Sequence, residues 1–144
     1  MGTERWESNW LVVSPPGAVA VDLGRSSARR HPRTPEVRAL PAGTPVVLFA
    51  SAPGAIRRCK AFAAASDVAL EDAYLAFPSA RAPAYLVEDD PAPLRLFVRT
   101  ILAAPPRRGS VSPLAAGLAV VRAFHPWRLI RSIAPGRVAV GKHR

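Results

Sequence analysis

The sequence predicts a small α/β domain in which a sheet with an antiparallel hairpin is packed by two or three helices. Three observations favour this fold class. The chain has 144 residues, the length of a single domain, and 49% of them are hydrophobic. Short apolar runs of strand length alternate with amphipathic helical stretches. The 16 prolines, about twice the average usage, fall mostly in clusters between those runs and therefore punctuate a fold.

The charge of the chain is strongly positive, with 20 basic residues against 10 acidic ones. Only Lys60 and Lys142 are lysines. A charge of this sign suits a nucleic acid or an anionic membrane as partner. A bias of the coding sequence toward Arg, Ala and Pro explains it equally well, so both interpretations stay open.

The number of cysteines and the N-terminal residues limit the cellular compartments that suit the protein. The single cysteine, Cys59, excludes an internal disulfide and any multi-cysteine metal site. The first ten residues, "MGTERWESNW", contain acids and none of the long apolar stretch of a signal peptide. We therefore expect a cytoplasmic protein, with peripheral association at a membrane kept open.

The N-terminal third combines a strand pattern with a long polar segment. Residues 10–23, "WLVVSPPGAVAVDL", predict two short strands around a Ser-Pro-Pro-Gly corner. Residues 24–45 are rich in Arg, Pro and Ser and have no apolar periodicity. They predict a loop within a single domain that spans residues 1–144.

The middle of the chain has the clearest order of elements. Val46 to Ala50 is a continuous apolar run, typical of a strand buried on both faces. Pro53 and Gly54 suit a corner, and a helix is expected from Ala55 to about residue 65. Residues 68–77 and 84–88 then predict an antiparallel pair joined by a proline-rich loop.

The C-terminal third predicts helices and a last strand. Asp90 suits the N-cap and Pro91 the first position of a helix with an apolar face that includes Leu94, Phe97 and Val98. Further helical stretches are expected at residues 114–124 and 127–134, and a short strand with a basic tail at 137–144. No run reaches the roughly 18 uninterrupted apolar residues that a membrane span requires.

Residues 46–90 resemble the closing part of a class I methyltransferase-like Rossmann domain, where a strand leads into a helix and a β-hairpin ends the sheet. The motif that carries the likeness is the hairpin "AYLAFPSARAPAYLVEDD", with Pro78 and Pro83 framing its connection. The cofactor site of that family needs a glycine-rich turn after the first strand and a carboxylate for the ribose. Here "VAVDLGRSS" offers Asp22 and Gly24 but no second glycine. The resemblance thus implies a shortened, Rossmann-like unit without a complete S-adenosylmethionine site.

One candidate anion site lies in the stretch "SAPGAIRR". The corner at Gly54 would present free backbone N–H groups at a helix start, and Arg57 and Arg58 follow within a turn. The spacing of a P-loop is absent, and a corner requires one glycine in any case. A structural turn therefore remains the competing interpretation.

A second candidate is a membrane or polyanion surface in the C-terminal third. Its stretches "LRLFVRTIL" and "VVRAFHPWRLIRSI" combine apolar faces with arginine and an interfacial tryptophan. The same faces would serve equally well to pack on the sheet. The candidate residues are Arg95, Arg99, Arg122, Trp127, Arg128 and Arg131.

No complete catalytic, cofactor or metal motif is evident, and the cofactor is left unknown. The three histidines lack metal-ligand spacing, and the acids Glu71, Asp72, Glu88, Asp89 and Asp90 are expected to pair with arginine more readily than to hold Mg²⁺. Two hypotheses follow. The first is a shortened methyltransferase-like domain, not catalytic alone, that works with a partner subunit as an accessory to cell-envelope or polysaccharide biosynthesis. The alternative is a basic peripheral module that binds an anionic membrane surface or, third in order, a nucleic acid.

Overall fold

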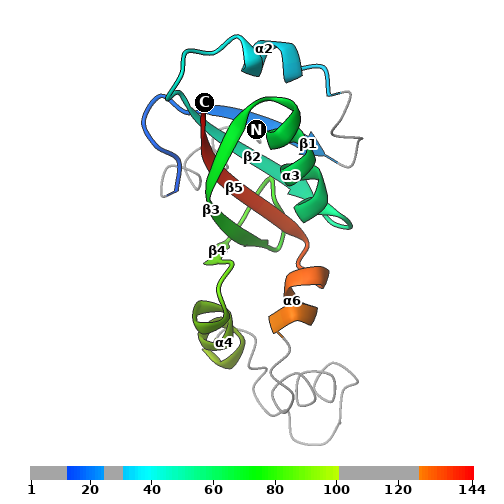
Figure 1. Cartoon of the computed structure of the whole chain (residues 1–144). Helices are drawn as coiled ribbons and strands as arrows, with labels where there is room; N and C mark the ends of the chain where they lie inside the picture. Colours follow the sequence, from blue (N-terminus) through cyan, green and yellow to red (C-terminus); the bar gives the residue numbers. More distant parts are fainter. Residues whose placement is uncertain (1–12, 25–30, 101–126) are drawn as a thin grey trace, which may run out of the picture.

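The protein is an α/β domain built on one mixed sheet of five strands in the order β1-β2-β5-β3-β4 (Figure 1). The computed structural model describes residues 13–24, 31–100 and 127–144, apart from the side chains of Thr100, Trp127 and Ile133. The sheet with its packed helices confirms the predicted α/β fold class. The strands are β1 (Val19–Gly24), β2 (Pro45–Ser51), β3 (Val68–Phe77), β4 (Tyr85–Glu88) and β5 (Gly136–His143).

The helices of the described residues are α2 (Thr34–Arg38), α3 (Ala55–Ala65), α4 (Pro91–Thr100) and α6 (Trp127–Ile133). The last three lie where helices were predicted. Five-residue α2 falls inside the segment predicted as a loop, which is a correction to that interpretation. Its only buried residue is Val37, so the sequence held almost no periodic signal for it. The predicted strand at 10–13 and helix at 114–124 lie outside the described residues, except that Val13 is in a turn.

The direction of the strands follows from their pairing. Strand β1 is parallel to β2, while β5 is antiparallel to both β2 and β3. Strands β1, β2 and β3 therefore run the same way, and α3 connects β2 to β3 across the inserted β5. The predicted hairpin is present as β3 and β4, with Tyr74 opposite Glu88 and Phe77 opposite Tyr85.

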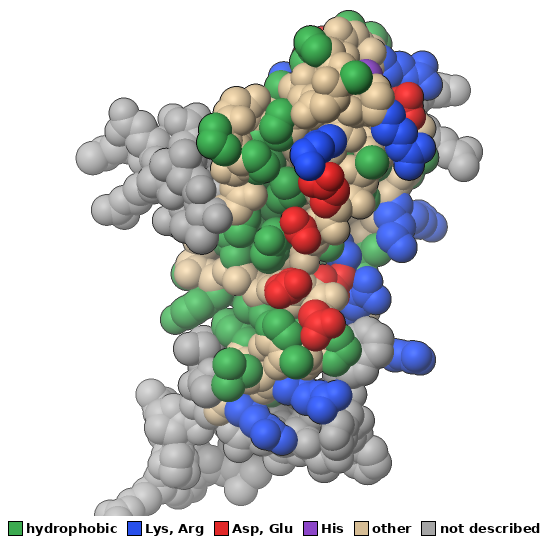
Figure 2. Space-filling view, turned by 60° about the vertical axis from the view of Figure 1, so that its left-hand side comes forward, with side chains coloured by type: hydrophobic (Ala, Val, Ile, Leu, Met, Phe, Trp, Pro, Cys, Tyr) green, Lys and Arg blue, Asp and Glu red, His purple; other side chains and the backbone are tan. Residues whose placement is uncertain are grey.

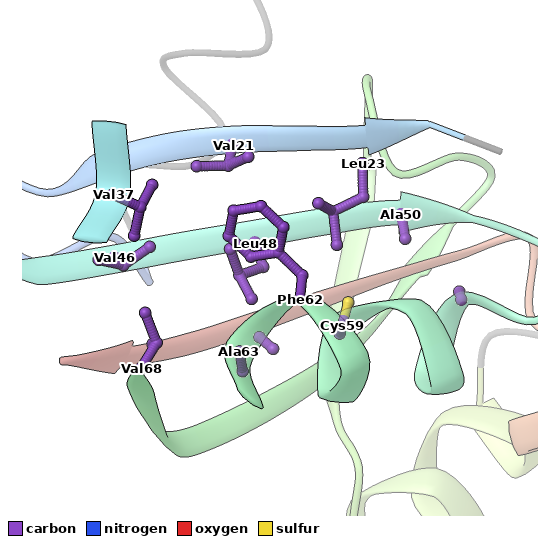
Figure 3. Packing of buried hydrophobic residues seen from close by; sticks show 12 residues of the cluster. Val21, Leu23, Val37, Val46, Leu48, Ala50, Cys59, Phe62, Ala63 and Val68 are labelled. Carbon is purple, nitrogen blue, oxygen red and sulfur yellow. The ribbon is translucent and has the colours of Figure 1, made fainter. Parts of the chain in front are cut away.

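The main core lies between the sheet and α3 (Figure 3). Alternate residues of β2, namely Val46, Leu48 and Ala50, face Phe62 and its neighbours on α3. The intervening Val47 and Phe49 belong to a second cluster on the opposite face. This double burial explains the continuous apolar run of β2, as predicted.

A third cluster joins α4 and α6 to the end of the sheet, below β3 and β4 in Figure 1. Leu94, Phe97 and Val98 of α4 are buried at i, i+3 and i+4 spacing against Leu75 and Ile130. Asp90 caps α4, because its Oδ1 accepts a hydrogen bond of 2.9 Å from the N–H of Ala92. The predicted capping residue is therefore confirmed.

Candidate functional site

The corner between β2 and α3 contains a residue in the left-handed helical conformation. Gly54 is the N-cap of α3 and has φ 78° and ψ 14°, a conformation that costs little only for glycine. Ala52 donates its N–H to the carbonyl oxygen of Pro135 at 2.9 Å, which ties this corner to the corner before β5. Two segments about 80 residues apart in the sequence thus meet where β2 ends and β5 begins.

Arg58 is engaged by the corner itself. Its Nη1 donates to the carbonyl oxygen of Pro53 at 2.7 Å, and its Nη2 donates to the carbonyl oxygen of Ser51. The guanidinium therefore satisfies backbone acceptors that the turn would otherwise leave unpaired. The sequence predicted Arg58 as part of an anion site. In the structure its guanidinium is hydrogen-bonded to the backbone of the corner and stabilises that turn.

Arg57 and the first turn of α3 are available to a ligand. The side chain of Arg57 is exposed and has no ion pair or hydrogen bond with the described residues. The first turn of α3 holds no acidic residue and no side-chain cap. The N–H of Arg58 reaches the carbonyl of Gly54, but those of Ala55, Ile56 and Arg57 have no acceptor among the described residues.

A pocket of about 230 Å³ opens at this place, between α3, α6 and the start of β5. It lies beyond the carboxyl end of β2, the side of an open α/β sheet on which ligands generally bind. Most of its wall is apolar, and its charged members are all arginines. The lining residues are Ala52, Gly54, Ala55, Ile56, Arg57, Leu75, Arg131, Ser132, Ala134, Gly136 and Arg137.

Two arginines of this wall share one buried carboxylate. Asp89 follows β4, and its side chain is only 4% exposed. Nε of Arg131 lies 2.8 Å from Oδ1 of Asp89 and 2.9 Å from Oδ2, and Nη2 of Arg137 also donates to Oδ2. The Arg137 side chain is 6% exposed, and its Nη1 is buried without a hydrogen-bond partner among the described residues.

The sequence indicated only part of this pocket. Gly54 and Arg57 were predicted from the corner, and Arg131 was assigned to the C-terminal surface, whereas the structure also places it in the pocket wall. Arg137 was missed. A signal was present, because Arg137 is a charged residue at the head of an apolar strand segment, "RVAV". Its burial depends on β5 lying in the middle of the sheet, which no local pattern reveals.

The predicted C-terminal surface is partly assembled by α4 and α6. Arg95 and Arg99 are exposed on α4 and Arg128 is exposed on α6, two helices that contact each other. Arg131 is 34% exposed and pairs with Asp89. Arg122 and the side chain of Trp127 lie outside the described residues.

Large apolar side chains are exposed between these arginines. Leu96 on α4 is 65% exposed and Leu129 on α6 is 51% exposed. Figure 2 shows Lys and Arg side chains beside hydrophobic ones at the lower end of the face that it presents. Above them on that face, acidic side chains form a column.

Two of the acidic side chains in and after the hairpin are paired with cations. Glu71 pairs with Lys142 at 2.9 Å, and Asp89 binds the two arginines described above. Among the described residues, no group of three or more His, Cys, Asp and Glu side chains is placed to hold a metal ion. Burial raises the pKa of Tyr74 above its usual value, and the charges of Asp72 and Glu88 raise it further.

Neither Cys59 nor Asp22 offers obvious chemistry. Burial raises the pKa of the Cys59 thiol to about 11, against the lowering effect of Arg137 and Arg58, so the thiol is protonated and unreactive at neutral pH. Asp22 accepts the N–H of Gly24 at 2.8 Å and pairs with Arg81 at 2.9 Å. It therefore has the role of a turn residue at the end of β1.

The chain matches no protein-family model, no curated protein and no solved structure. Within the described residues, no helix has both the length and the apolar character needed to span a bilayer.

Proposed function

We propose that this chain is a basic peripheral domain that docks on an anionic membrane surface through α4 and α6. The observation that carries the proposal is the exposure of Leu96 and Leu129, at 65% and 51%, on two contacting helices that also expose Arg95 and Arg99. Arginine around exposed leucine is the composition of an interfacial helix.

The expected energetics suit reversible binding. Each arginine close to an anionic surface contributes on the order of 1 kcal/mol, and this attraction decays over a Debye length of about 8 Å at physiological salt. Burying the exposed leucines at the boundary between the headgroups and the acyl chains adds a favourable term of about 25 cal/mol for each Å² of apolar surface removed from water. Arg131 contributes less in this proposal, because its guanidinium is held against Asp89 and its side chain is only 34% exposed.

Vesicle co-sedimentation tests the proposal with the full chain. We expect binding to vesicles that contain phosphatidylserine, no binding to phosphatidylcholine alone, and progressive release as the salt concentration rises. Single-stranded DNA added in solution distinguishes the nucleic-acid alternative. Tight binding of DNA, together with no binding to anionic vesicles, would contradict the membrane proposal and favour a nucleic-acid partner.

The second candidate is the shortened methyltransferase-like domain that acts beside a partner subunit, as an accessory to cell-envelope or polysaccharide biosynthesis. The observation that favours it is that β1, β2 and β3 run the same way, with α3 as the connection from β2 to β3. This is the kind of unit from which Rossmann-like sheets are made. Calorimetry with S-adenosylmethionine tests it: the isolated chain should not bind, and stoichiometric binding would contradict a non-catalytic accessory role.

A further inference from the structure

We propose that the pocket between α3, α6 and the start of β5 binds a small organic anion, with one oxyanion group and a short apolar body. This inference is independent of membrane docking, because the ligand is soluble and the pocket is lined by neither Leu96 nor Leu129, the exposed leucines of the proposed membrane surface. Four features of the pocket carry it.

The first feature is the unpartnered guanidinium nitrogen of Arg137. The Arg137 side chain is 6% exposed and lines the pocket, and its buried Nη1 has no hydrogen-bond partner in the described part of the chain. Native proteins rarely leave a buried charged donor unsatisfied, because its desolvation is costly. An anion in the pocket would lie beside this guanidinium and offset the cost of burying its charge.

The second feature is the net positive charge of the two arginines that pair with Asp89. Arg131 and Arg137 share the single carboxylate of Asp89, so the three side chains together carry a net charge of +1. Water reaches Arg131, which is 34% exposed, but hardly reaches Arg137, so a counter-ion in the pocket would still be favourable. The net positive charge of the three side chains also disfavours a cation in the pocket.

The third feature is the helix start that faces the same space. Gly54, Ala55, Ile56 and Arg57 all line the pocket, and the N–H groups of the last three have no acceptor among the described residues. The positive end of the helix dipole and the exposed Arg57 add to the field of Arg137. The first turn of α3 contains no acidic residue that would oppose an anion.

The fourth feature is the apolar remainder of the wall, which sets the class of ligand. Ala52, Ala55, Ile56, Leu75 and Ala134 make up most of the other lining residues. A volume of about 230 Å³ is below the range of roughly 300–1,000 Å³ typical of drug-sized ligands and cofactors. A phosphate monoester or carboxylate with a few carbon atoms fits this size and this lining, whereas a bare inorganic ion would leave the apolar wall unused.

Titration of the full chain with matched small molecules tests the inference. The ligands are butyl phosphate, butyrate, inorganic phosphate and butanol, at constant ionic strength, followed by the amide signals of Ala55, Ile56 and Arg57 and the guanidinium signals of Arg137 in NMR spectra. We expect saturable shifts with butyl phosphate or butyrate, weaker binding of inorganic phosphate and none of butanol. Equal affinity for inorganic and butyl phosphate, or shifts that sodium chloride reproduces, would overturn the inference.

A matched pair of variants locates the site. Arg57→Ala and Lys60→Ala each remove one exposed positive charge from α3, but only Arg57 lines the pocket. Loss of one charge-assisted contact should weaken binding of the better ligand about tenfold in Arg57→Ala and leave it nearly unchanged in Lys60→Ala. Equal effects of the two substitutions would mean a general charge effect and would overturn the inference.

Vesicle binding by Arg57→Ala separates a soluble ligand from a lipid headgroup. We expect this variant to sediment with anionic vesicles as the unchanged protein does. Loss of its vesicle binding in parallel with its loss of butyl phosphate binding would overturn the assignment of a soluble ligand.

Discussion

Asp89 and Arg137 form an ion pair between the end of the β3–β4 hairpin and the start of β5, with side chains only 4% and 6% exposed. Arg131, at the end of α6, joins the same carboxylate. Asp89 therefore holds together the hairpin, the last helix and the central strand at one end of the sheet. It also sets the position of the two arginines that line the pocket.

Substitution of this carboxylate should be strongly destabilising. Asp89→Asn keeps the shape of the side chain but leaves Arg137 buried without its counter-charge. We expect the free energy of unfolding, measured by urea titration at pH 7, to fall by about 3–5 kcal/mol. The control is Glu88→Gln at the adjacent, exposed position, which should change it by less than about 0.5 kcal/mol. Similar losses in both variants would contradict a specific role for the buried pair.

Gly141 is required by the close approach of β5 to β3. A Cβ atom at this position would overlap the carbonyl oxygen of Ala69 and lie 2.9 Å from its carbonyl carbon. Because both partners are backbone atoms of a paired strand, Gly141→Ala should displace the central strand and cost at least about 3 kcal/mol of unfolding free energy.

A second glycine separates this steric effect from backbone strain. Gly17 has φ 74°, but a Cβ there would meet nothing within 4 Å. Gly17→Ala should therefore cost only the strain of a left-handed residue, about 1–2 kcal/mol. A larger loss in Gly17→Ala than in Gly141→Ala, measured under the same conditions, would refute the argument.

The Cys59 thiol should make stability depend on alkaline pH. Its pKa is raised from 9.0 to about 11 in the folded protein, so the folded state holds the proton more tightly than the unfolded state. Stability from this group is complete below about pH 9 and is lost as the pH rises toward 11. Between these values the unfolding free energy should fall by about 2 kcal/mol more in the unchanged protein than in Cys59→Ala. Parallel pH profiles would contradict the assignment, and the comparison cancels Tyr74, which titrates in both proteins.

Local patterns in the sequence predicted those elements whose signal lies within one short stretch of the chain. The run from Val46 to Ala50 specified a strand covered on both faces, and the corner at Gly54 specified the start of α3. The β3–β4 hairpin and the capping of α4 by Asp90 followed from turn and cap chemistry. These features depend on residues close together in the chain.

Features that depend on distant pairing could not be predicted. The last strand was expected to be a short terminal element, yet β5 lies between β2 and β3 and is buried from Gly136 to Gly141. Asp89 and Arg137 are 48 residues apart, so no spacing rule brings them together. The sequence therefore predicted only the part of the pocket wall that the corner after β2 supplies, namely Gly54 and Arg57.

The proposed membrane surface predicts which arginines control binding. Arg95→Glu combined with Arg99→Glu reverses two exposed charges on α4, beside the exposed Leu96. Arg38→Glu combined with Lys60→Glu makes the same change in net charge at exposed positions of α2 and α3. If the lipid contacts α4, the first variant should lose about 2 kcal/mol or more of binding to anionic vesicles, since each arginine near the surface contributes on the order of 1 kcal/mol. The second should lose much less, because attraction over more than a Debye length of about 8 Å is largely screened. Leu96→Ser with Leu129→Ser should weaken binding in a way that persists at high salt, since it removes apolar contact. Equal losses in the two charge-reversal variants would show that the charge of the whole chain attracts the vesicles without a defined contact surface on α4 and α6.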